Sequence, residues 1–476
     1  MKPVILLYKF VLVLIAGLIM CLLGNCSRQA DKPSILFILV DDLGKEWISC
    51  YGAEDIETPN IDALANNGML FNNAYSMPQC TPSRVSLLTG KYPWRTGWVN
   101  HWDVPRYGVG YFDWKKKENM TFARILRDAG YRTAAAGKWQ INDFRVEPRS
   151  MEKHGFEDWC MWTGGEGQNP PSDQRYWNPY INTPSGSKTY KGKFGPDLYS
   201  EFLINFIGKN ADKPMMLYFP MALTHTPFTT TPDMPDVKEN MEKHRAMVLY
   251  TDKIVGQLVL ALEEAGIRDK TIIIFTTDNG TSRSVTGKQN GIDVPGGKSL
   301  KTENGVCAPF IVNCPGLVPS GVVTDALTDF TDLMPTFLEL AGISPPSGLI
   351  IDGSSIAPLL LGKAEDSPRE WIMALGHHRA RVDSLGIRGI HDFASRVIRD
   401  KKYKVWVDEN RSITRLHDLA VDPLEKVNLI NSSKPEHIQA IKKFQAVVDL
   451  LPEKDARPLY EPREALPWDV HFEGEK

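Results

Sequence analysis

Hard oxygen ligands follow two apolar segments of this 476-residue chain. Asp41 and Asp42 come directly after one apolar run, and Asp278 and Asn279 come directly after another. Carboxylate and carboxamide oxygens suit calcium or magnesium better than zinc. Three carboxylates brought together would repel one another unless a divalent cation neutralised them. For either pair alone we would favour a structural role, a helix N-cap at Asp42 or a turn at Asp278-Asn279-Gly280, but the four residues together predict a site for a hard cation.

Basic and titratable side chains occupy similar positions elsewhere in the chain. Lys138 and His225 follow two further apolar runs, Lys298 follows a pair of glycines, and Arg84 lies in a predicted helix. Such groups around a bound cation would form a pocket for a tetrahedral oxyanion, either sulfate or phosphate. The alternative is a set of unrelated surface charges, since the chain has 55 lysines and arginines.

Cys80 is a candidate nucleophile. It lies just ahead of a predicted helix, with Pro82 near the favoured first position. The amino end of that helix would offer amide donors and partial positive charge to an anion. An unmodified thiol is poorly suited to displacing sulfate, and the alternative interpretation is a buried structural cysteine.

Alternating strands and helices must position these residues. Segments that are apolar on both faces are typical of strands inside a parallel sheet, and we predict strands at Ser34–Val40, Tyr131–Ala136, Met215–Met221, Thr271–Thr277 and Pro309–Val312. Helical patterns, each followed by a glycine that would serve as the C-cap, cover residues 60–67, 122–129, 197–207 and 243–265. This alternation predicts a doubly wound α/β sheet, in which ligands bind beyond the carboxyl ends of the strands.

The pattern changes after about Gly362. Residues 394–407 predict two short strands, residues 413–419 a third, and residues 435–451 an amphipathic helix. We therefore expect a catalytic domain over residues 33–362 and a smaller C-terminal α+β subdomain over residues 363–476, built from an antiparallel sheet and a helix.

The N-terminus predicts export. Two lysines and an apolar run at Phe10–Leu23 are typical of a signal peptide and are short for a membrane span. Residues 23–26 (Leu-Gly-Asn-Cys) resemble a bacterial lipobox, in which Cys26 would be lipidated and would attach the protein to a membrane. The alternative is an uncleaved anchor. We expect residues 1–26 to be a signal peptide, and the protein to be periplasmic, at the cell surface or secreted.

Bulk composition excludes several classes of protein. With 42% hydrophobic and 24% charged residues, the chain is neither disordered nor a multi-span membrane protein. The formal charge of −3 provides no positive excess for nucleic acid. Seven cysteines are present, and the sequence assigns no disulfide partners.

Two segments resemble the signatures of the type I, formylglycine-dependent sulfatases. Residues 80–90 (CTPSRVSLLTG) match the signature that directs cysteine modification, and residues 130–139 (GYRTAAAGKW) match the second signature. Shorter similarities include Val-Asp-Asp at 40–42, Asp278-Asn279-Gly280, Gly297-Lys298 with Glu303, and two C-terminal motifs ending at Lys404 and Pro423. The resemblance spans residues 33–450 and implies an alkaline-phosphatase-like fold, with a mostly parallel sheet between helices.

The resemblance also implies a mechanism. A maturation enzyme, either formylglycine-generating or anaerobic sulfatase-maturating, would oxidise Cys80 to formylglycine. One hydroxyl of the aldehyde hydrate would attack sulfur, the alcohol would leave, and sulfate would be expelled as the aldehyde re-forms. Asp41, Asp42, Asp278 and Asn279, with the modified Cys80, would hold one Ca²⁺ that withdraws charge from the sulfate oxygens.

The same resemblance assigns roles to the basic residues. Arg84 would steady the formylglycine, Lys138 and Lys298 would clamp the sulfate oxygens, and His225 would protonate the leaving oxygen.

One position departs from the family pattern. The family has histidine after Gly-Lys-Trp, where this chain has Gln140, and that histidine is assigned as the base that helps eject sulfate. Glutamine cannot accept a proton at neutral pH. Asp143, His154 or a water relay could replace the base, or turnover could be impaired. Cys307 also replaces an arginine common in relatives, at a position that bears on substrate contacts.

The leading hypothesis is an exported sulfatase that acts on a sulfated carbohydrate. The predicted insertion loop Gly164–Lys193 contains aromatic residues, Tyr176, Trp177, Tyr180 and Tyr190, that could stack on sugar rings or simply pack. A second hypothesis is a catalytically impaired relative that binds sulfated glycans, and a third is a phosphonate or phosphate ester hydrolase on the same scaffold.

Overall fold

A computed structural model describes most of the chain after the N-terminal segment. The described residues are 32–99, 120–141, 144, 148–163, 174–376, 380–383, 386–389 and 391–456, with the backbone alone described for 380–383 and 386–389. The signal-peptide prediction, Cys26, Asp143 and the first part of the insertion (164–173) lie outside them. Within the described part, no helix combines the length and apolar character needed to cross a membrane.

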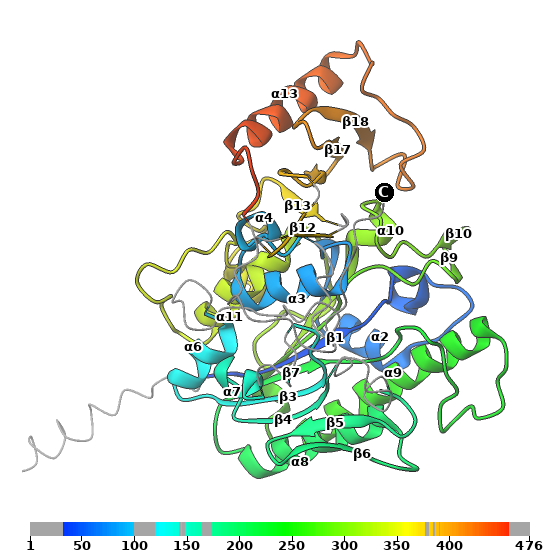
Figure 1. Ribbon diagram of the computed structural model, residues 1–476, viewed down its shortest axis with the longest axis vertical. Helices are drawn as coiled ribbons and strands as arrows, with labels where there is room; N and C mark the ends of the chain where they lie inside the picture. Colours follow the sequence, from blue (N-terminus) through cyan, green and yellow to red (C-terminus); the bar gives the residue numbers. More distant parts are fainter. Residues whose placement is uncertain are drawn as a thin grey trace, which may run out of the picture.

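A sheet of ten strands forms the centre of the molecule (Figure 1). Its order is β12-β2-β11-β8-β1-β7-β3-β4-β5-β6. The strands are β1 (Ser34–Val40), β2 (Met69–Tyr75), β3 (Arg132–Lys138), β4 (Asp158–Trp162), β5 (Tyr180–Thr183), β6 (Gly186–Thr189), β7 (Met215–Pro220), β8 (Thr271–Thr277), β11 (Cys307–Asn313) and β12 (Val322–Asp329). The central strands β8, β1, β7, β3 and β4 run parallel, which brings their carboxyl ends to one edge.

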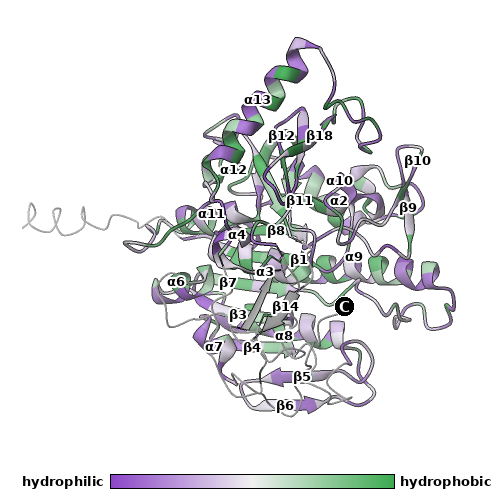
Figure 2. Ribbon diagram, turned by 45° about the horizontal axis from the view of Figure 1, so that its top comes forward, coloured by the Kyte–Doolittle hydropathy of each residue, from purple (hydrophilic) through white to green (hydrophobic). Residues whose placement is uncertain are grey.

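Helices cover both faces of this sheet, because alternate side chains of each strand point to opposite faces. Ile35, Phe37 and Leu39 of β1 pack with α3 (Cys80–Thr89), α6 (Phe122–Asp128) and α11 (Leu333–Leu340). Leu36, Ile38 and Val40 pack with α2 (Pro59–Asn66), α8 (Gly195–Asn210) and α9 (Asn240–Glu264). In Figure 1, α3 and α11 lie above the central strands β1, β7 and β3, and α8 lies below them. Figure 2 shows hydrophobic residues gathered in the central strands, whereas helices such as α9 and α13 carry hydrophobic and hydrophilic residues side by side. This is the predicted α/β sandwich.

The C-terminal subdomain is also as predicted. A four-stranded antiparallel sheet contains β13 (Ile372–Leu375), β16 (Arg396–Arg399), β17 (Tyr403–Val407) and β18 (Ile413–Asp418), and α13 (Pro435–Leu450) packs on it. Its buried residues belong to the same core as α3 and α11, so the subdomain is packed directly onto the catalytic part. Shorter elements are α4 (Pro93–Thr96), α7 (Ser150–Lys153), α10 (Glu303–Val306), α12 (Ala357–Leu360) and two hairpins, β9 (Thr286–Gln289) with β10 (Ile292–Pro295) and β14 (Ala380–Asp383) with β15 (Gly386–Gly389).

Several local predictions were wrong. The described part of the insertion is no simple loop, because β5 and β6 form a hairpin that extends the sheet antiparallel to β4. The helix predicted to end before Gly208 continues to Asn210, since helical hydrogen bonding there tolerates glycine. The strand containing Pro309 runs antiparallel to β8 and β2. The sequence-based prediction also missed β2, β4 and β12, whose residues are less uniformly apolar.

Cysteine pairing is absent among the described residues. Cys50, Cys80, Cys160, Cys307 and Cys314 are all free thiols.

Candidate active site

Two parallel strands bring the predicted oxygen ligands together. β1 and β8 pair with Val40 opposite Thr277, so Asp41–Asp42 and Asp278–Asn279 leave the sheet side by side. The Asn279 amide donates to Asp42 Oδ1 over 2.7 Å, and the Asp42 backbone N–H donates to Asp278 Oδ1 over 3.2 Å. All four side chains are buried. The sequence prediction that these residues converge is therefore matched by the fold.

The electrostatics of this group fit a bound cation. Burial and the neighbouring charge of Asp41 raise the pKa of Asp278 to about 7. Burial alone would raise the pKa of Asp41 as well, but Lys138, His225 and Arg84 hold that pKa well below its ordinary value. The Oδ1 atom of Asn279 is buried and accepts no hydrogen bond, although a buried carbonyl oxygen normally has a partner. A hard divalent cation would supply that partner and relieve the crowding of the carboxylates.

Basic side chains balance the carboxylates one by one. Lys138 Nζ lies 2.6 Å from Asp41 Oδ2, and Lys298 Nζ lies 2.6 Å from Asp42 Oδ2. Arg84 Nη2 lies 2.7 Å from Asp278 Oδ2, and its Nη1 donates to the Lys138 carbonyl over 2.7 Å. Lys138 is the last residue of β3, whereas Lys298 reaches the site from a loop after β10. These cations therefore lie where they could contact the oxygens of a bound oxyanion.

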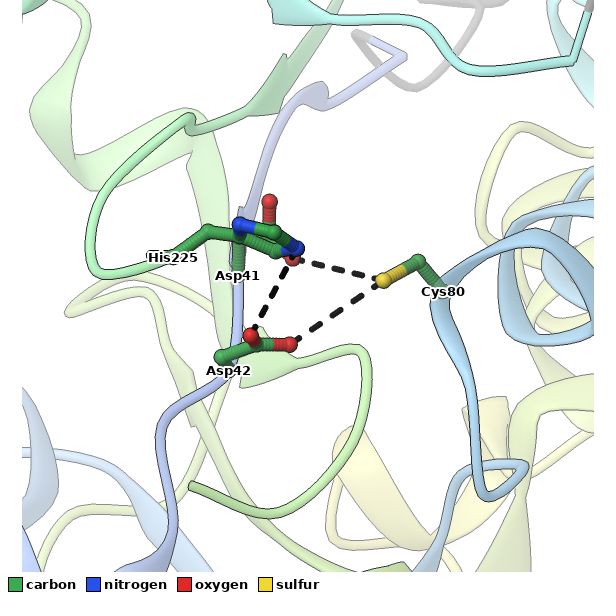
Figure 3. A group of neighbouring side chains, drawn as sticks. All are labelled: Asp41, Asp42, Cys80 and His225. Atoms are coloured by element: carbon green, nitrogen blue, oxygen red, sulfur yellow. Dashed lines mark hydrogen bonds and ion pairs between the residues drawn. The ribbon is translucent and has the colours of Figure 1, made fainter. Parts of the chain in front are cut away.

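Cys80 faces this charged group. Its Sγ lies 3.5 Å from Asp41 Oδ1 and 4.0 Å from Asp42 Oδ1 (Figure 3). It also lies 3.6 Å from Lys138 Nζ. Cys80 is itself the first residue of α3 and follows an N-cap at Gln79, so the prediction that the helix begins after it was wrong. Burial, together with the charge of Asp278, raises the pKa of the Cys80 thiol. The unmodified side chain is thus a protonated thiol and a weak nucleophile.

His225 closes the opposite side of the group, as Figure 3 shows. Its Nε2 lies 3.7 Å from Asp42 Oδ2, and single ligand atoms of Asp41, Asp42, Cys80 and His225 all lie within 4.8 Å of one another. Burial and the charge of Lys138 lower the pKa of His225 well below its ordinary value. The ring is therefore neutral at neutral pH, and it can donate a hydrogen bond without carrying charge.

Gln140 is buried beside the same edge. Its backbone is left-handed, with φ of 57°, and its carbonyl lies 3.5 Å from Thr81 Oγ1. The proposed substitute base His154 packs its ring against Trp139, with centroids 5.2 Å apart. Burial lowers the pKa of His154 to about 3, so this ring holds a proton too weakly to replace the missing histidine.

The insertion contributes Arg175, which the sequence analysis did not name, and Tyr176, which it named only as an aromatic residue that could stack on sugar or pack. Tyr176 donates to the carbonyls of Ala222 and His225 over 2.7 and 2.6 Å, and Arg175 donates to the Thr226 carbonyl. These bonds hold the loop that carries His225. The only signal in the sequence was the length and composition of the insertion.

The aromatic residues of the insertion serve mainly in packing. Tyr176 is buried, and Trp177 is partly buried with its ring 4.9 Å from that of Phe194 and its Nε1 bonded to Thr230 O over 3.0 Å. Tyr180 and Tyr190 are partly buried, and both lie on the hairpin strands or next to them. A sugar-stacking role for Tyr176 is therefore not supported, because its ring is covered by protein.

Cys307 begins β11 and is partly buried. Its Sγ lies 3.1 Å from Lys45 Nζ, so a lysine provides positive charge beside this position.

Comparisons with known proteins agree with this geometry. Residues 33–343 match the sulfatase family model, and residues 297–449 match a model described as the C-terminal part of N-sulphoglucosamine sulphohydrolase. The chain is 31% identical over 386 residues to human N-acetylgalactosamine-6-sulfatase, covering 75% of this chain and 72% of the relative. It is 27% identical over 439 residues to the ulvan-active sulfatase of Formosa agariphila, covering 86% and 80%.

A solved structure shares the whole architecture. Ps i-CgsB, crystallised in complex with k-i-k-neocarrahexaose, superposes with a TM-score of 0.73 at 25% identity, covering 90% of this chain and 95% of that one. The fold is therefore the alkaline-phosphatase-like fold that the sequence predicted. Given the matched family model, the relatives above 30% identity and the cluster around Cys80, this chain belongs to the sulfatase family and is a sulfuric ester hydrolase.

Proposed function

We propose that this protein is an exported, calcium-dependent sulfatase that removes sulfate esters from a sulfated carbohydrate. The observation that carries the proposal is the juxtaposition of Cys80 with Asp41, Asp42 and His225, whose ligand atoms lie within 4.8 Å of one another. An ordinary buried cysteine has apolar neighbours, whereas this one is surrounded by ionisable groups.

Calcium would be held by Asp41, Asp42, Asp278 and Asn279, together with the modified Cys80. When bound, it would polarise the sulfate oxygens and stabilise the charge that develops on them. The carboxylates are buried, so a cation would bind them away from water, and Asn279 Oδ1 accepts no hydrogen bond and is available as a ligand. Calcium is preferred over zinc because the four unmodified ligands proposed for it, Asp41, Asp42, Asp278 and Asn279, all offer oxygen.

Cys80 would be converted to formylglycine by a maturation enzyme, and its hydrate would supply the oxygen nucleophile that a protonated thiol cannot supply. Arg84 would fix this residue through its bonds to Asp278 and the Lys138 carbonyl. Lys138 and Lys298 would exchange their carboxylate partners for sulfate oxygens once calcium takes over the carboxylates. His225 would donate from Nε2 to the oxygen of the leaving alcohol.

A carbohydrate substrate is supported by the relatives. One is named for its action on ulvan, and one similar structure holds a carrageenan oligosaccharide. Export, with or without lipidation of Cys26, is supported by the N-terminal sequence alone. A phosphonate monoester hydrolase of Agrobacterium radiobacter shares the fold with a TM-score of 0.63, but its 18% identity supports no shared chemistry.

A sulfate-release assay tests the proposal. The full chain, co-expressed with a maturation enzyme and loaded with calcium, is incubated with a panel of defined sulfated oligosaccharides. We expect release from at least one, and loss of release by at least about a hundredfold in Cys80→Ala. The matched control is Cys314→Ala, which removes another buried thiol outside the site.

Two outcomes would contradict the proposal. Equal sulfate release by the wild type and Cys80→Ala would show that residue 80 is not the nucleophile. A mass spectrum showing only unmodified thiol at position 80 in active protein would show that formylglycine is not required.

A further inference from the structure

Arg175 is a buried arginine at the edge of the active site. Only 8% of its surface is exposed, and its backbone is fixed near the start of α8, where the Tyr199 hydroxyl donates to its carbonyl over 3.4 Å. Its hydrogen bonds within the described residues all leave from Nη2, to the Thr226 carbonyl and to His225 Nδ1, which lies 3.1 Å away. Both acceptors are neutral, so the positive charge of Arg175 has no carboxylate partner among these contacts.

Among the described residues, no hydrogen bond leaves from the other nitrogens of Arg175. Its Nε is buried and forms no hydrogen bond. The guanidinium stacks on two aromatic rings, 4.5 Å from the centroid of Trp162 and 5.5 Å from that of Tyr176. These rings attract the cation through their faces, but they do not supply a hydrogen-bond acceptor. A buried charge of this kind is costly unless an anion pairs with it.

The other cations of the site differ in this respect. Lys138, Lys298 and Arg84 each contact a carboxylate, at 2.6, 2.6 and 2.7 Å. Arg175 lies on the outer side of His225, since its Nη2 faces Nδ1 while the Nε2 of the same ring faces Asp42. It is therefore separated from the reacting centre by one imidazole ring, which is a distance that a neighbouring substituent on the same substrate could span.

We propose that Arg175 binds a second anionic group of the substrate, a carboxylate or a further sulfate close to the ester that is cleaved. A planar guanidinium with free donors matches either anion through paired hydrogen bonds. The inference rests on the proposed function, and it narrows the substrate class to carbohydrates with two neighbouring negative groups.

A purely structural role is the competing explanation. In that case Arg175 would only connect the insertion to the loop that carries His225, and its loss would lower the binding affinity for all substrates equally. The two explanations differ in whether Arg175 distinguishes a dianionic molecule from a monoanionic one.

Binding measured without turnover separates them. The calcium-loaded full chain carrying Cys80→Ala is titrated calorimetrically with three probes: 4-nitrophenyl sulfate, and its derivatives with a carboxylate or a second sulfate on the adjacent ring carbon. We expect at least one dianionic probe to bind about tenfold or more tightly than the monoanionic one. The same comparison in Cys80→Ala/Arg175→Gln should show this preference lost, and Arg175→Lys should retain part of it.

Arg132→Gln in the same background is the matched control. Arg132 also lies near an aromatic ring, 6.0 Å from that of Phe206, but it pairs with Glu157 at the opposite end of β3. The Arg132→Gln variant should keep the same preference for dianionic over monoanionic probes. Thermal unfolding of each variant confirms folding.

The two derivatives distinguish a carboxylate from a sulfate as the second group. Three outcomes would each overturn the inference. They are equal affinity for all three probes, no measurable binding of any probe, and a preference for dianionic probes that survives Arg175→Gln. The sulfate-release assay tests the proposed function separately, because it varies Cys80 and leaves Arg175 unchanged.

Discussion

At the scale of single residues, the site is organised by complementary charge. Each carboxylate at the ends of β1 and β8 has a cation within 2.7 Å, so the group is close to neutral before any ligand binds. A divalent cation and a sulfate ester can then enter together without leaving a large net charge buried. Asn279 Oδ1 lacks a hydrogen-bond partner and the contacts of Arg175 include no carboxylate, so these two groups indicate what could be bound.

Asn279→Ala should weaken calcium binding by about tenfold to a hundredfold, because it removes an uncharged oxygen ligand and the amide that orients Asp42. Calcium titration calorimetry of the metal-stripped protein measures this directly. Asn313→Ala is the control, since its side-chain amide is also hydrogen-bonded to backbone carbonyls, those of Leu64 and Asn67, but outside the site. An unchanged calcium affinity in Asn279→Ala would exclude Asn279 from the metal site.

Gln140→His should raise kcat by about tenfold, because it restores a proton acceptor at the position where the family has one. The left-handed backbone at this position is tolerated by histidine better than by most residues. Steady-state kinetics on the substrate found by the release assay measure the change, and Gln140→Asn, which adds no base, is the control. No gain in kcat would show that another group already performs this step.

At the scale of elements, the site depends on how closely β3 and β7 approach. Gly137, the residue before Lys138, has φ of 115°, and a Cβ there would lie 2.0 Å from the Pro220 carbonyl of β7. The glycine therefore allows the two strands to meet at the point where Lys138 enters the site. The match to the second sulfatase signature identified this glycine, but its physical role depends on a strand distant in sequence.

Gly137→Ala should destabilise the protein by roughly 3 kcal/mol or more, because a side chain would clash with backbone and strain the left-handed conformation. Gly130→Ala is the control: its φ of 94° imposes similar strain, but no atom lies within 4 Å of the added Cβ. That variant should lose only about 1 kcal/mol. Urea unfolding measures both, and equal losses would contradict the role assigned to the close approach.

At the scale of the whole molecule, buried ion pairs join the C-terminal subdomain to the loop that carries Lys298. Glu303 accepts from Arg399 Nη1 over 2.8 Å and from Lys404 Nζ over 2.9 Å, and it also contacts the Tyr75 hydroxyl. Lys404 donates to the Lys301 carbonyl over 2.7 Å. The subdomain thus helps to hold Lys298, three residues from that carbonyl, in the site.

Glu303→Gln should destabilise the protein by about 3 kcal/mol, because buried Arg399 would lose its carboxylate partner and Lys404 would keep only Glu425, 3.1 Å away. Burial by itself would raise the pKa of Glu303, but the positive charges of Lys404 and Arg399 lower this pKa from 4.5 to about 2. Its stabilising contribution is therefore present above pH 4.5 and is lost as the pH falls from 4.5 towards 2. Urea unfolding across this range should show a shallower acid dependence in the variant.

The control for this prediction is Glu436→Gln, at an exposed position in the first turn of α13. It should match the wild type in both stability and acid dependence. An identical pH profile for Glu303→Gln and the wild type would contradict the assigned role of the ion pairs.

The sequence by itself determined the fold class, the C-terminal subdomain and the convergence of Asp41, Asp42, Asp278 and Asn279, because these follow from local apolar runs and from the geometry of parallel strands. The antiparallel direction of β11, the hairpin in the insertion and the continuation of α8 past Gly208 were decided only in the folded chain. So were the neutral state of His225 and the unmatched charge of Arg175. Burial, pairing direction and charge balance depend on residues far apart in sequence, and local patterns do not record such contacts.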